Sequence, residues 1–223
     1  MNLFRILYDD RLGELSYLLA DPVSREAVLI DPHGRDLPVL AAMLGEGGLR
    51  LRWVLRTHGH DDLQPGEFER LAAWRVPVVQ GLAREGAWRP GADECLPFGN
   101  ETLQVLATPG HTAHCLSFLW RDRLFCGGLL AAADCPLQPL PADPGAMWDS
   151  VTNRVFTLPD EILLFHSHTR RARAVSTVLE QRCWHPWFAG LPRDGFLALV
   201  ASLAAGDAQT PASAPESTQL ALP

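Results

Sequence analysis

One short segment combines two histidines with two aspartates and is suited to metal chemistry. It reads Thr57-His58-Gly59-His60-Asp61-Asp62-Leu63 and directly follows an apolar stretch typical of a strand. In an extended or gently turning loop, alternate side chains share one side, so His58, His60 and Asp62 can converge. Two imidazoles and a carboxylate suit zinc or a non-haem metal. The spacing therefore predicts metal ligands, against the alternative of a polar loop with incidental histidines.

Two further histidine segments lie later in the chain. Thr108-Pro109-Gly110-His111-Thr112 predicts a sharp turn after a strand, from which His111 projects. Phe165-His166-Ser167-His168 closes an apolar stretch that we expect to be a buried strand. Neither segment indicates a metal site alone, because a histidine after a strand is often a hydrogen-bonded surface residue. The order of the three segments is more specific.

In this order the segments resemble the metallo-β-lactamase fold family, in the branch with glyoxalase II and the persulfide (sulfur) dioxygenases. The signature of that branch is a T-H-x-H-x-D-H loop, a P-G-H turn, a G-D dipeptide and a late A-H. Segments without ligands also look like persulfide dioxygenase sequence, at 17–21, 25–32, 148–151, 156–159 and 175–180. The resemblance covers residues 3–204.

The resemblance implies two metal subsites, of which only the first is complete. His58, His60 and His111 would form the first. The second would use Asp62, the last loop histidine and His168, with an aspartate that bridges both ions. The last loop position here is Leu63, and the bridging position is Gly128.

Two remaining ligands cannot hold a divalent ion against water, so we expect one ion in the three-histidine subsite. In persulfide dioxygenases, the resemblance implies an iron bound by the first loop histidine, the P-G-H histidine and the bridging aspartate. Only His58 and His111 remain of that set, and His60, His166 or Asp134 could supply the third donor. We expect Asp62 and His168 to be the catalytic residues.

Two departures from the family concern the substrate pocket. The segment after the G-D position is replaced by residues 129–136, and the late A-H-D-Y becomes Ser167-His168-Thr169-Arg170. These changes remove residues around the metal, so the substrate could differ. Arg170 and Arg171 are candidates to bind a carboxylate of a glutathione-like substrate, with a solvated helix face as the alternative.

The elements that position these residues form two groups of strands with helices between them. Strands are expected at 3–8, 15–20, 26–31, 51–56, 76–80, 102–107, 115–120, 124–126 and 162–165, and helices at 36–44, 67–74, 147–156, 171–182 and 194–204. This pattern fits a layered α/β sandwich, and the resemblance implies a four-layer αβ/βα sandwich of two mixed β-sheets with outer helices. Residues 1–205 are expected to be a single domain, and 206–223, rich in Ala, Pro, Ser and Thr, a mobile tail.

Composition narrows the function classes. The 223 residues are 47% hydrophobic with a net charge of -7, which fits a globular domain and argues against nucleic-acid or membrane partners. All 19 basic residues are arginine, so Schiff-base chemistry on lysine is excluded. Five dispersed cysteines form no CxxC pair, so neither a disulfide framework nor a zinc knuckle is predicted. With no leader-like start, the expected compartment is the cytoplasm.

Three hypotheses follow, in order of preference. The first is a mononuclear non-haem iron oxygenase that acts on a small-molecule thiol persulfide such as glutathione persulfide. The second is an inactive binding or regulatory protein that keeps the fold without a metal. The third is a zinc-dependent thioester or lactone hydrolase of glyoxalase II type. The cofactor is one divalent ion, with Fe(II) preferred over Zn(II), and the resemblance suggests a homodimer.

Overall fold

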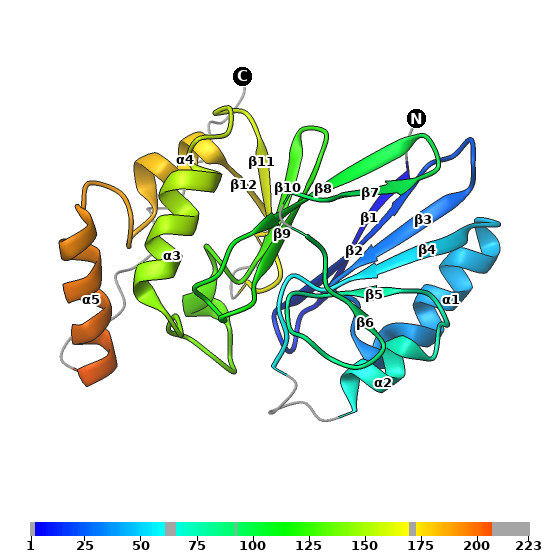
Figure 1. The fold of residues 1–223 in the computed structure, drawn as a ribbon, viewed down its shortest axis with the longest axis horizontal. Coiled ribbons are helices and arrows are strands. Elements are labelled where there is room, and N and C mark those ends of the chain that lie inside the picture. Colours follow the sequence, from blue (N-terminus) through cyan, green and yellow to red (C-terminus); the bar gives the residue numbers. More distant parts are fainter. Residues whose placement is uncertain (1–2, 61–65, 92, 170–172, 207–223) are drawn as a thin grey trace, which may run out of the picture.

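The structure, a computed structural model, describes residues 3–60, 66–91, 93–169 and 173–206. Two six-stranded sheets face each other in its centre, with α1 and α2 outside one sheet and α3, α4 and α5 outside the other (Figure 1). This is the predicted four-layer sandwich. Among the described residues, no helix combines the length and apolar character needed to cross a bilayer.

The first sheet contains the first half of the chain, and its strands are adjacent in sequence order. They are β1 (Leu3–Asp9), β2 (Glu14–Ala20), β3 (Glu26–Ile30), β4 (Arg50–Leu55), β5 (Val78–Val79) and β6 (Ala87–Trp88). The pairs β1–β2 and β2–β3 are antiparallel, and the later pairs are parallel. The sheet is therefore mixed, as predicted.

The second sheet contains the second half of the chain. Its strands are β7 (Cys95–Phe98), β8 (Glu101–Ala107), β9 (Leu116–Trp120), β10 (Arg123–Gly127), β11 (Leu163–His166) and β12 (Val175–Thr177). Only β10 and β11 pair in parallel, because the chain between them crosses the outer face of the sheet. This sheet is also mixed.

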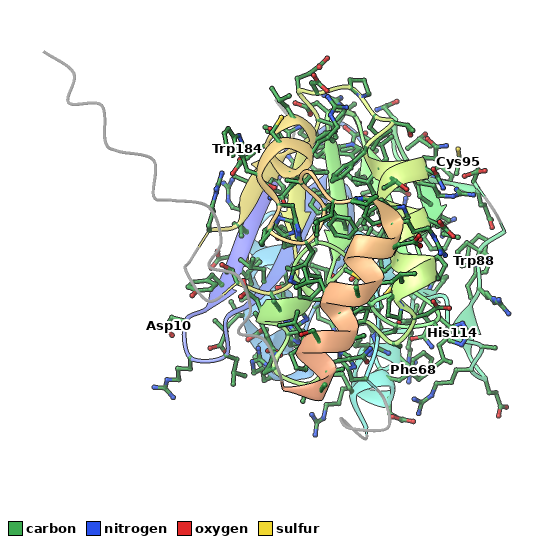
Figure 2. All side chains as sticks on the ribbon, turned by 90° about the vertical axis from the view of Figure 1, so that its left-hand side faces the viewer. Asp10, Phe68, Trp88, Cys95, His114 and Trp184 are labelled. Carbon is green, nitrogen blue, oxygen red and sulfur yellow. The ribbon has the colours of Figure 1, made fainter. Side chains whose placement is uncertain are left out.

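Helices cover the outer faces of both sheets. They are α1 (Leu37–Glu46), α2 (Glu67–Ala72), α3 (Pro144–Ser150), α4 (Val178–Trp184) and α5 (Arg193–Ala205), with one-turn helices at Gly34–Asp36, Ala132–Asp134 and Val151–Val155. The helix α5 crosses the front of the molecule in Figure 2. Its buried side chains Phe196 and Val200 pack in the apolar layer beneath it.

Strand β2 shows why two apolar layers form. Alternate side chains of a strand point to opposite faces. Tyr17 and Leu19 pack between the two sheets, whereas Leu18 and Ala20 pack against α1. The Tyr17 hydroxyl also donates a hydrogen bond to the carbonyl of His166, across the sheet interface. Strand β2 thus packs against helix α1 on one face and against the opposite sheet on the other.

Two expectations about the elements were wrong. The helix expected at 171–182 begins only at Val178, because Val175–Thr177 pairs with β11 as strand β12. Thr177 then caps the helix, with its Oγ1 accepting from the Glu180 N–H at 3.1 Å. Strands β6 and β7 were not among the expected elements. Strand β7 contains Pro97 and lies at a sheet edge, where proline is tolerated. Of the expected tail, residues 207–223 lie outside the described part.

Candidate metal centre

Four histidines meet where strands of both sheets end. His58 and His60 follow β4, His111 follows β8, and His168 follows β11. The His58 ring centroid lies 4.9 Å from that of His111, 5.1 Å from that of His168 and 5.2 Å from that of His60. The structure thus brings together four of the histidines that the sequence singled out. The expected catalytic Asp62, and Leu63 beside it, lie outside the described residues.

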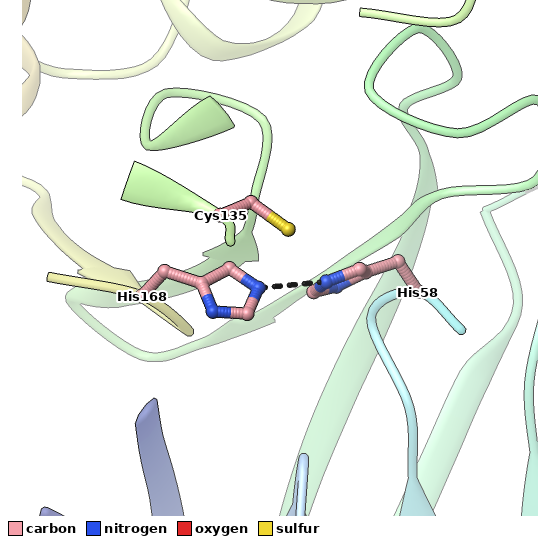
Figure 3. A group of neighbouring side chains, drawn as sticks. All are labelled: His58, Cys135 and His168. Carbon is pink, nitrogen blue, oxygen red and sulfur yellow. Dashed lines mark hydrogen bonds between the residues drawn. The ribbon is translucent and has the colours of Figure 1, made fainter. Parts of the chain in front are cut away.

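His58 and His168 point their outer ring nitrogens at each other. The two Nε2 atoms are 3.0 Å apart. A dashed line marks this contact in Figure 3. When both rings are neutral, one Nε2–H donates to the lone pair of the other. The two nitrogens therefore already converge on one point.

A hydrogen-bond relay fixes the orientation of His58. The backbone N–H and the hydroxyl of Thr57 both donate to the Asp31 carboxylate at 2.7 Å. Since its only hydroxyl proton is used there, Thr57 Oγ1 accepts from His58 Nδ1–H at 2.8 Å. This tautomer leaves the Nε2 lone pair directed into the cluster, as a metal ligand requires.

Gly127 makes room for this relay. Its φ is +57°, and a Cβ at this position would overlap the Thr57 side chain. Any larger residue would push Thr57 away from His58. The relay is further supported by Ser167, whose hydroxyl donates to Asp31.

His111 is fully buried and has one nitrogen without a partner. Its Nε2 lies 3.2 Å from the carbonyl oxygen of Gln138, to which it donates, so Nδ1 carries the lone pair. Within the described part of the chain, that Nδ1 has no hydrogen-bond partner, and the same holds for Nδ1 of His168. Buried nitrogens without partners are costly, which fits a cluster built to receive an ion.

Gly128, at the expected bridging position, is in contact with His111. A Cβ built there would overlap the His111 ring. An aspartate could therefore not be accommodated without a shift of His111. The missing bridge and the position of this histidine are linked.

Cys135 is the residue that sequence reasoning missed. Two triads bring their donor atoms within 4.8 Å of one another, and Cys135 belongs to both: His58, Cys135 and His168, and His60, His111 and Cys135. Its Sγ lies 3.4 Å from His60 Nε2, and its side chain is buried. The only sequence signal was its place in the segment 129–136, where the chain departs from its family.

The other candidates for a third donor do not join these triads. His166 places Nε2 3.2 Å from Ser176 Oγ and Nδ1 3.6 Å from Cys126 Sγ, so both its nitrogens are engaged elsewhere. Asp134 precedes Cys135 but belongs to neither triad. A role for His166 as the third donor is therefore not what the geometry favours.

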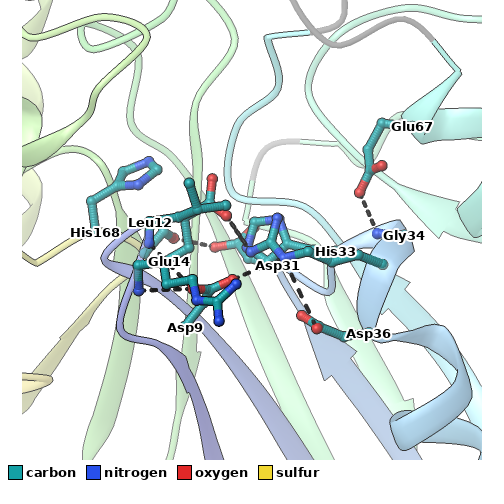
Figure 4. Close-up of polar contacts among 12 residues, drawn as sticks. Asp9, Leu12, Glu14, Asp31, His33, Gly34, Asp36, Glu67 and His168 are labelled. Atoms are coloured by element: carbon teal, nitrogen blue, oxygen red, sulfur yellow. Dashed lines mark hydrogen bonds and ion pairs between the residues drawn. The ribbon is translucent and has the colours of Figure 1, made fainter.

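Carboxylates near His168 are paired with arginine. The buried Glu14 accepts from Arg35, and its Oε2 lies 3.7 Å from His33 Nε2. Arg35 also bonds Asp9 at 3.1 Å, and Figure 4 shows this network beside His168. Arg35 thus offsets the charge of Glu14. The donors of the two triads are imidazoles and a thiol.

Burial sets the protonation of the cluster. It lowers the pKa of His111 to about 4 and that of His168 to about 3, with smaller contributions from neighbouring histidines. It also holds the pKa of His58 well below the usual value. Neutral imidazoles offer the lone pairs that a metal needs. Burial raises the pKa of the Cys135 thiol, which would lose its proton on binding a metal.

A cleft of about 370 Å³ opens beside His58 and His60. Among its other lining residues are Gln80, Thr112 and Gln138, which offer polar groups. His114, also on this cleft, is exposed at the molecular surface (Figure 2). The candidate substrate residues Arg170 and Arg171 lie outside the described residues.

Known proteins resemble the chain over most of its length, although no family model matches it. It is 33% identical over 190 residues to the human mitochondrial persulfide dioxygenase ETHE1, covering 82% of this chain and 75% of that protein. The crystal structure of ETHE1 from Myxococcus xanthus superposes with a TM-score of 0.80 at 31% identity, covering 90% of this chain and 91% of the other. A hydroxyacylglutathione hydrolase of Yersinia enterocolitica is 35% identical over 157 residues, covering 68% of this chain and 60% of the hydrolase.

Sequence and structure lead to the same assignment. The alignments span both sheets, and the two mixed six-stranded sheets with outer helices are the fold of the structural relatives. The family implies a metal cofactor, and the histidine cluster supplies donors for it. The chain belongs to the persulfide dioxygenase branch of the metallo-β-lactamase superfamily, near the hydroxyacylglutathione hydrolases.

Proposed function

We propose that the chain is a mononuclear non-haem iron oxygenase that acts on a low-molecular-weight thiol persulfide such as glutathione persulfide. The observation that carries this proposal is the buried histidine cluster beside an open cleft, in a chain related to persulfide dioxygenases. The volume of about 370 Å³ falls within the range of small-molecule sites.

The proposed cofactor is one Fe(II) ion held by His58, His60 and His111. Three protein donors leave open positions, and a bound iron would supply the redox chemistry with O₂. His58 and His111 contribute neutral imidazoles, because burial keeps them unprotonated. The relay from Asp31 through Thr57 orients the first of these rings. His58 belongs to one donor triad and His60 and His111 to the other, so the three rings would have to draw closer to share the ion.

The residues that would handle the substrate are proposed as follows. Asp62 and His168 are the catalytic candidates, and His168 already lies against His58. Gln80 and Thr112 line the cleft and would contact the body of a thiol there. Arg170 and Arg171 would bind its carboxylates.

Two alternatives lead to different measurements. A zinc-dependent thioester or lactone hydrolase is favoured by the relationship to hydroxyacylglutathione hydrolases and by the suitability of imidazole and thiol donors for zinc. An inactive binding protein is favoured by Leu63 and Gly128 at expected ligand positions. A single domain over 1–205 and a homodimer are also proposed, and unpaired thiols favour a cytoplasmic location.

The test is metal content and activity of one preparation, purified without added metal. About one equivalent of iron, with oxygen uptake that depends on glutathione persulfide, is the expected result. Bound zinc, together with hydrolysis of a hydroxyacylglutathione thioester, would contradict the oxygenase and support the hydrolase. If neither substrate is turned over after loading with iron or zinc, the result would support the inactive binding protein. The His111→Ala variant is the control for activity from contaminating metal.

A further inference from the structure

We propose that the Cys135 thiolate is a ligand of the metal ion and supplies the anionic donor that Gly128 cannot supply. This inference rests on the proposed metal centre, and it adds a donor of a different chemical class. It predicts that the centre holds a single ion with a sulfur ligand.

Cys135 lies between the two pairs of histidines. Its Sγ is within 4.8 Å of the donor atoms of His58 and His168, and equally of those of His60 and His111. In Figure 3 its sulfur points toward the place where His58 and His168 meet. No other described residue is shared by both triads. Cys135 is therefore placed to share an ion with histidines of either triad.

The backbone after β10 holds Cys135 in this place. Successive turns are closed by Leu129 N–H to the Cys126 carbonyl at 3.0 Å and by Cys135 N–H to the Ala132 carbonyl at 3.0 Å. The carbonyl of Leu130 accepts from His185 Nε2 at 3.1 Å, which joins this segment to the chain beyond α4. The segment is therefore fixed at both ends and not free to swing the thiol away.

Gly128 leaves the cluster without the anionic donor of the family pattern. Since a Cβ there would overlap His111, no side chain at this position can reach the ions while His111 stays in place. The anionic donor must then come from another residue. Among the described acidic residues, Glu14 is paired with Arg35 and Asp31 accepts from Thr57 and Ser167. Asp134 belongs to neither triad, which leaves Cys135.

Charge balance favours a single ion. On binding, the Cys135 thiol releases its proton to solvent and becomes a thiolate. One divalent ion, this thiolate and the Asp31 carboxylate behind Thr57 sum to zero charge, and the buried Arg56 near His58 adds one positive charge. A second divalent ion would add two positive charges that no further described donor of the cluster offsets, at a high cost in a buried place. A thiolate also selects zinc, iron or cobalt over ions that prefer oxygen.

The experiment uses the full chain, stripped of metal and titrated with Co(II). Wild type should bind one equivalent and show a thiolate-to-cobalt charge-transfer band in the near ultraviolet. Cys135→Ser should lose the band and bind Co(II) at least ~10-fold more weakly. Cys126→Ser is the matched control, because this buried thiol contacts His166 and lies outside both triads. It should keep the band and the affinity.

A second measurement needs no variant and therefore decides even if Cys135→Ser does not fold. X-ray absorption of the zinc-loaded wild type should show one sulfur at about 2.3 Å from the metal. A first shell of nitrogen and oxygen alone, or an unchanged cobalt spectrum in Cys135→Ser, would overturn the proposal. Persulfide-dependent oxygen uptake with an all-nitrogen-and-oxygen shell would leave the proposed function standing without this ligand. A sulfur ligand without persulfide-dependent oxygen uptake would support the Cys135 ligand and contradict the proposed function.

Discussion

Nε2 of His58 lies 3.0 Å from Nε2 of His168, although one ring follows the first sheet and the other the second. Backbone hydrogen bonds join the sheets beside this contact: Leu15 N–H donates to the Ser167 carbonyl at 2.9 Å, and Thr169 N–H to the Gly13 carbonyl at 2.8 Å. The spacing of the two rings is therefore set by the packing of the sheets rather than by either loop alone.

His111→Ala should abolish tight metal binding. The change removes a fully buried imidazole from the cluster. Substitution of residues that merely support a ligand can lower metal affinity ~100-fold, so loss of the ligand itself should lower it at least as much. Metal stoichiometry after one purification is the measurement. His114→Ala, in the same loop but exposed, should retain the metal. Equal metal in wild type and His111→Ala would contradict the site.

Thr57→Val should weaken metal binding by about 10- to 100-fold, because it removes the hydroxyl that orients His58. It should also lower the free energy of unfolding by about 1–3 kcal/mol, since Asp31 loses a donor. Thr108→Val is the control: it breaks a buried bond to Ser117 that does not involve the relay. Equal losses of metal affinity in both variants would show that the relay has no special role.

Gly128→Ala should lower the free energy of unfolding by about 1–3 kcal/mol, because its methyl group overlaps the His111 ring. It should lower metal affinity as well. Gly45→Ala, in helix α1 with open space around the added methyl, should instead stabilise by about 0.4–1 kcal/mol. Urea unfolding of both variants measures the difference. A Gly128→Ala variant as stable as Gly45→Ala would mean that His111 moves without cost.

His185 should make the fold sensitive to acid. It donates from Nε2 to the Leu130 carbonyl, and its Nδ1 accepts from the Trp187 N–H. Both hydrogen bonds can form only while the ring is neutral. Burial lowers its pKa from 6.5 to about 4, so the unfolded chain binds a proton that the folded chain excludes. Stability is thus full above pH 6.5 and lost as the pH falls toward 4.

The contribution of His185 should reach about 2 kcal/mol by pH 5. The measurement is the change in unfolding free energy between pH 7 and pH 5, in wild type and in His185→Asn. The variant should lose less stability than wild type on acidification, whatever its stability at pH 7. An equal change in both proteins would show that His185 is not the group responsible.

Removing residues 207–223 should leave the thermal midpoint within about 2 °C of the full chain. The segment offers no apolar periodicity to bury, and helix α5 is already closed by Gly206 with its N–H bonded to the Leu203 carbonyl at 3.2 Å. Thermal unfolding of the truncated chain is the test. A fall of many degrees would show that the segment packs on the domain.

The sequence was informative where chemistry and chain order coincide. The segments around His58, His111 and His168 each follow a strand, and strand ends of a sandwich meet at one edge, so their convergence could be predicted. Strand β12 could not be predicted from periodicity, because pairing with β11 outweighs the local helical pattern. The Thr177-x-x-Glu180 spacing, a capping signal, would have placed the start of α4 correctly.

Cys135 escaped prediction for a different reason. A single cysteine has no spacing partner, and its segment has no counterpart in the family pattern. Its position depends on the turns after β10 and on the bond from His185 to Leu130, which join parts of the chain 55 residues apart. Only the folded structure reveals such a donor.

The chain passes from one sheet to the other only once among its described strands, between Trp88 and Cys95. A break in that crossing would yield two fragments, each with one whole sheet. His58 and His60 would lie on the first, and His111, Cys135 and His168 on the second. Neither fragment would contain the complete set of donors. Tight metal binding would therefore require the two halves to reassociate, and it would measure that reassociation as in a split-protein sensor.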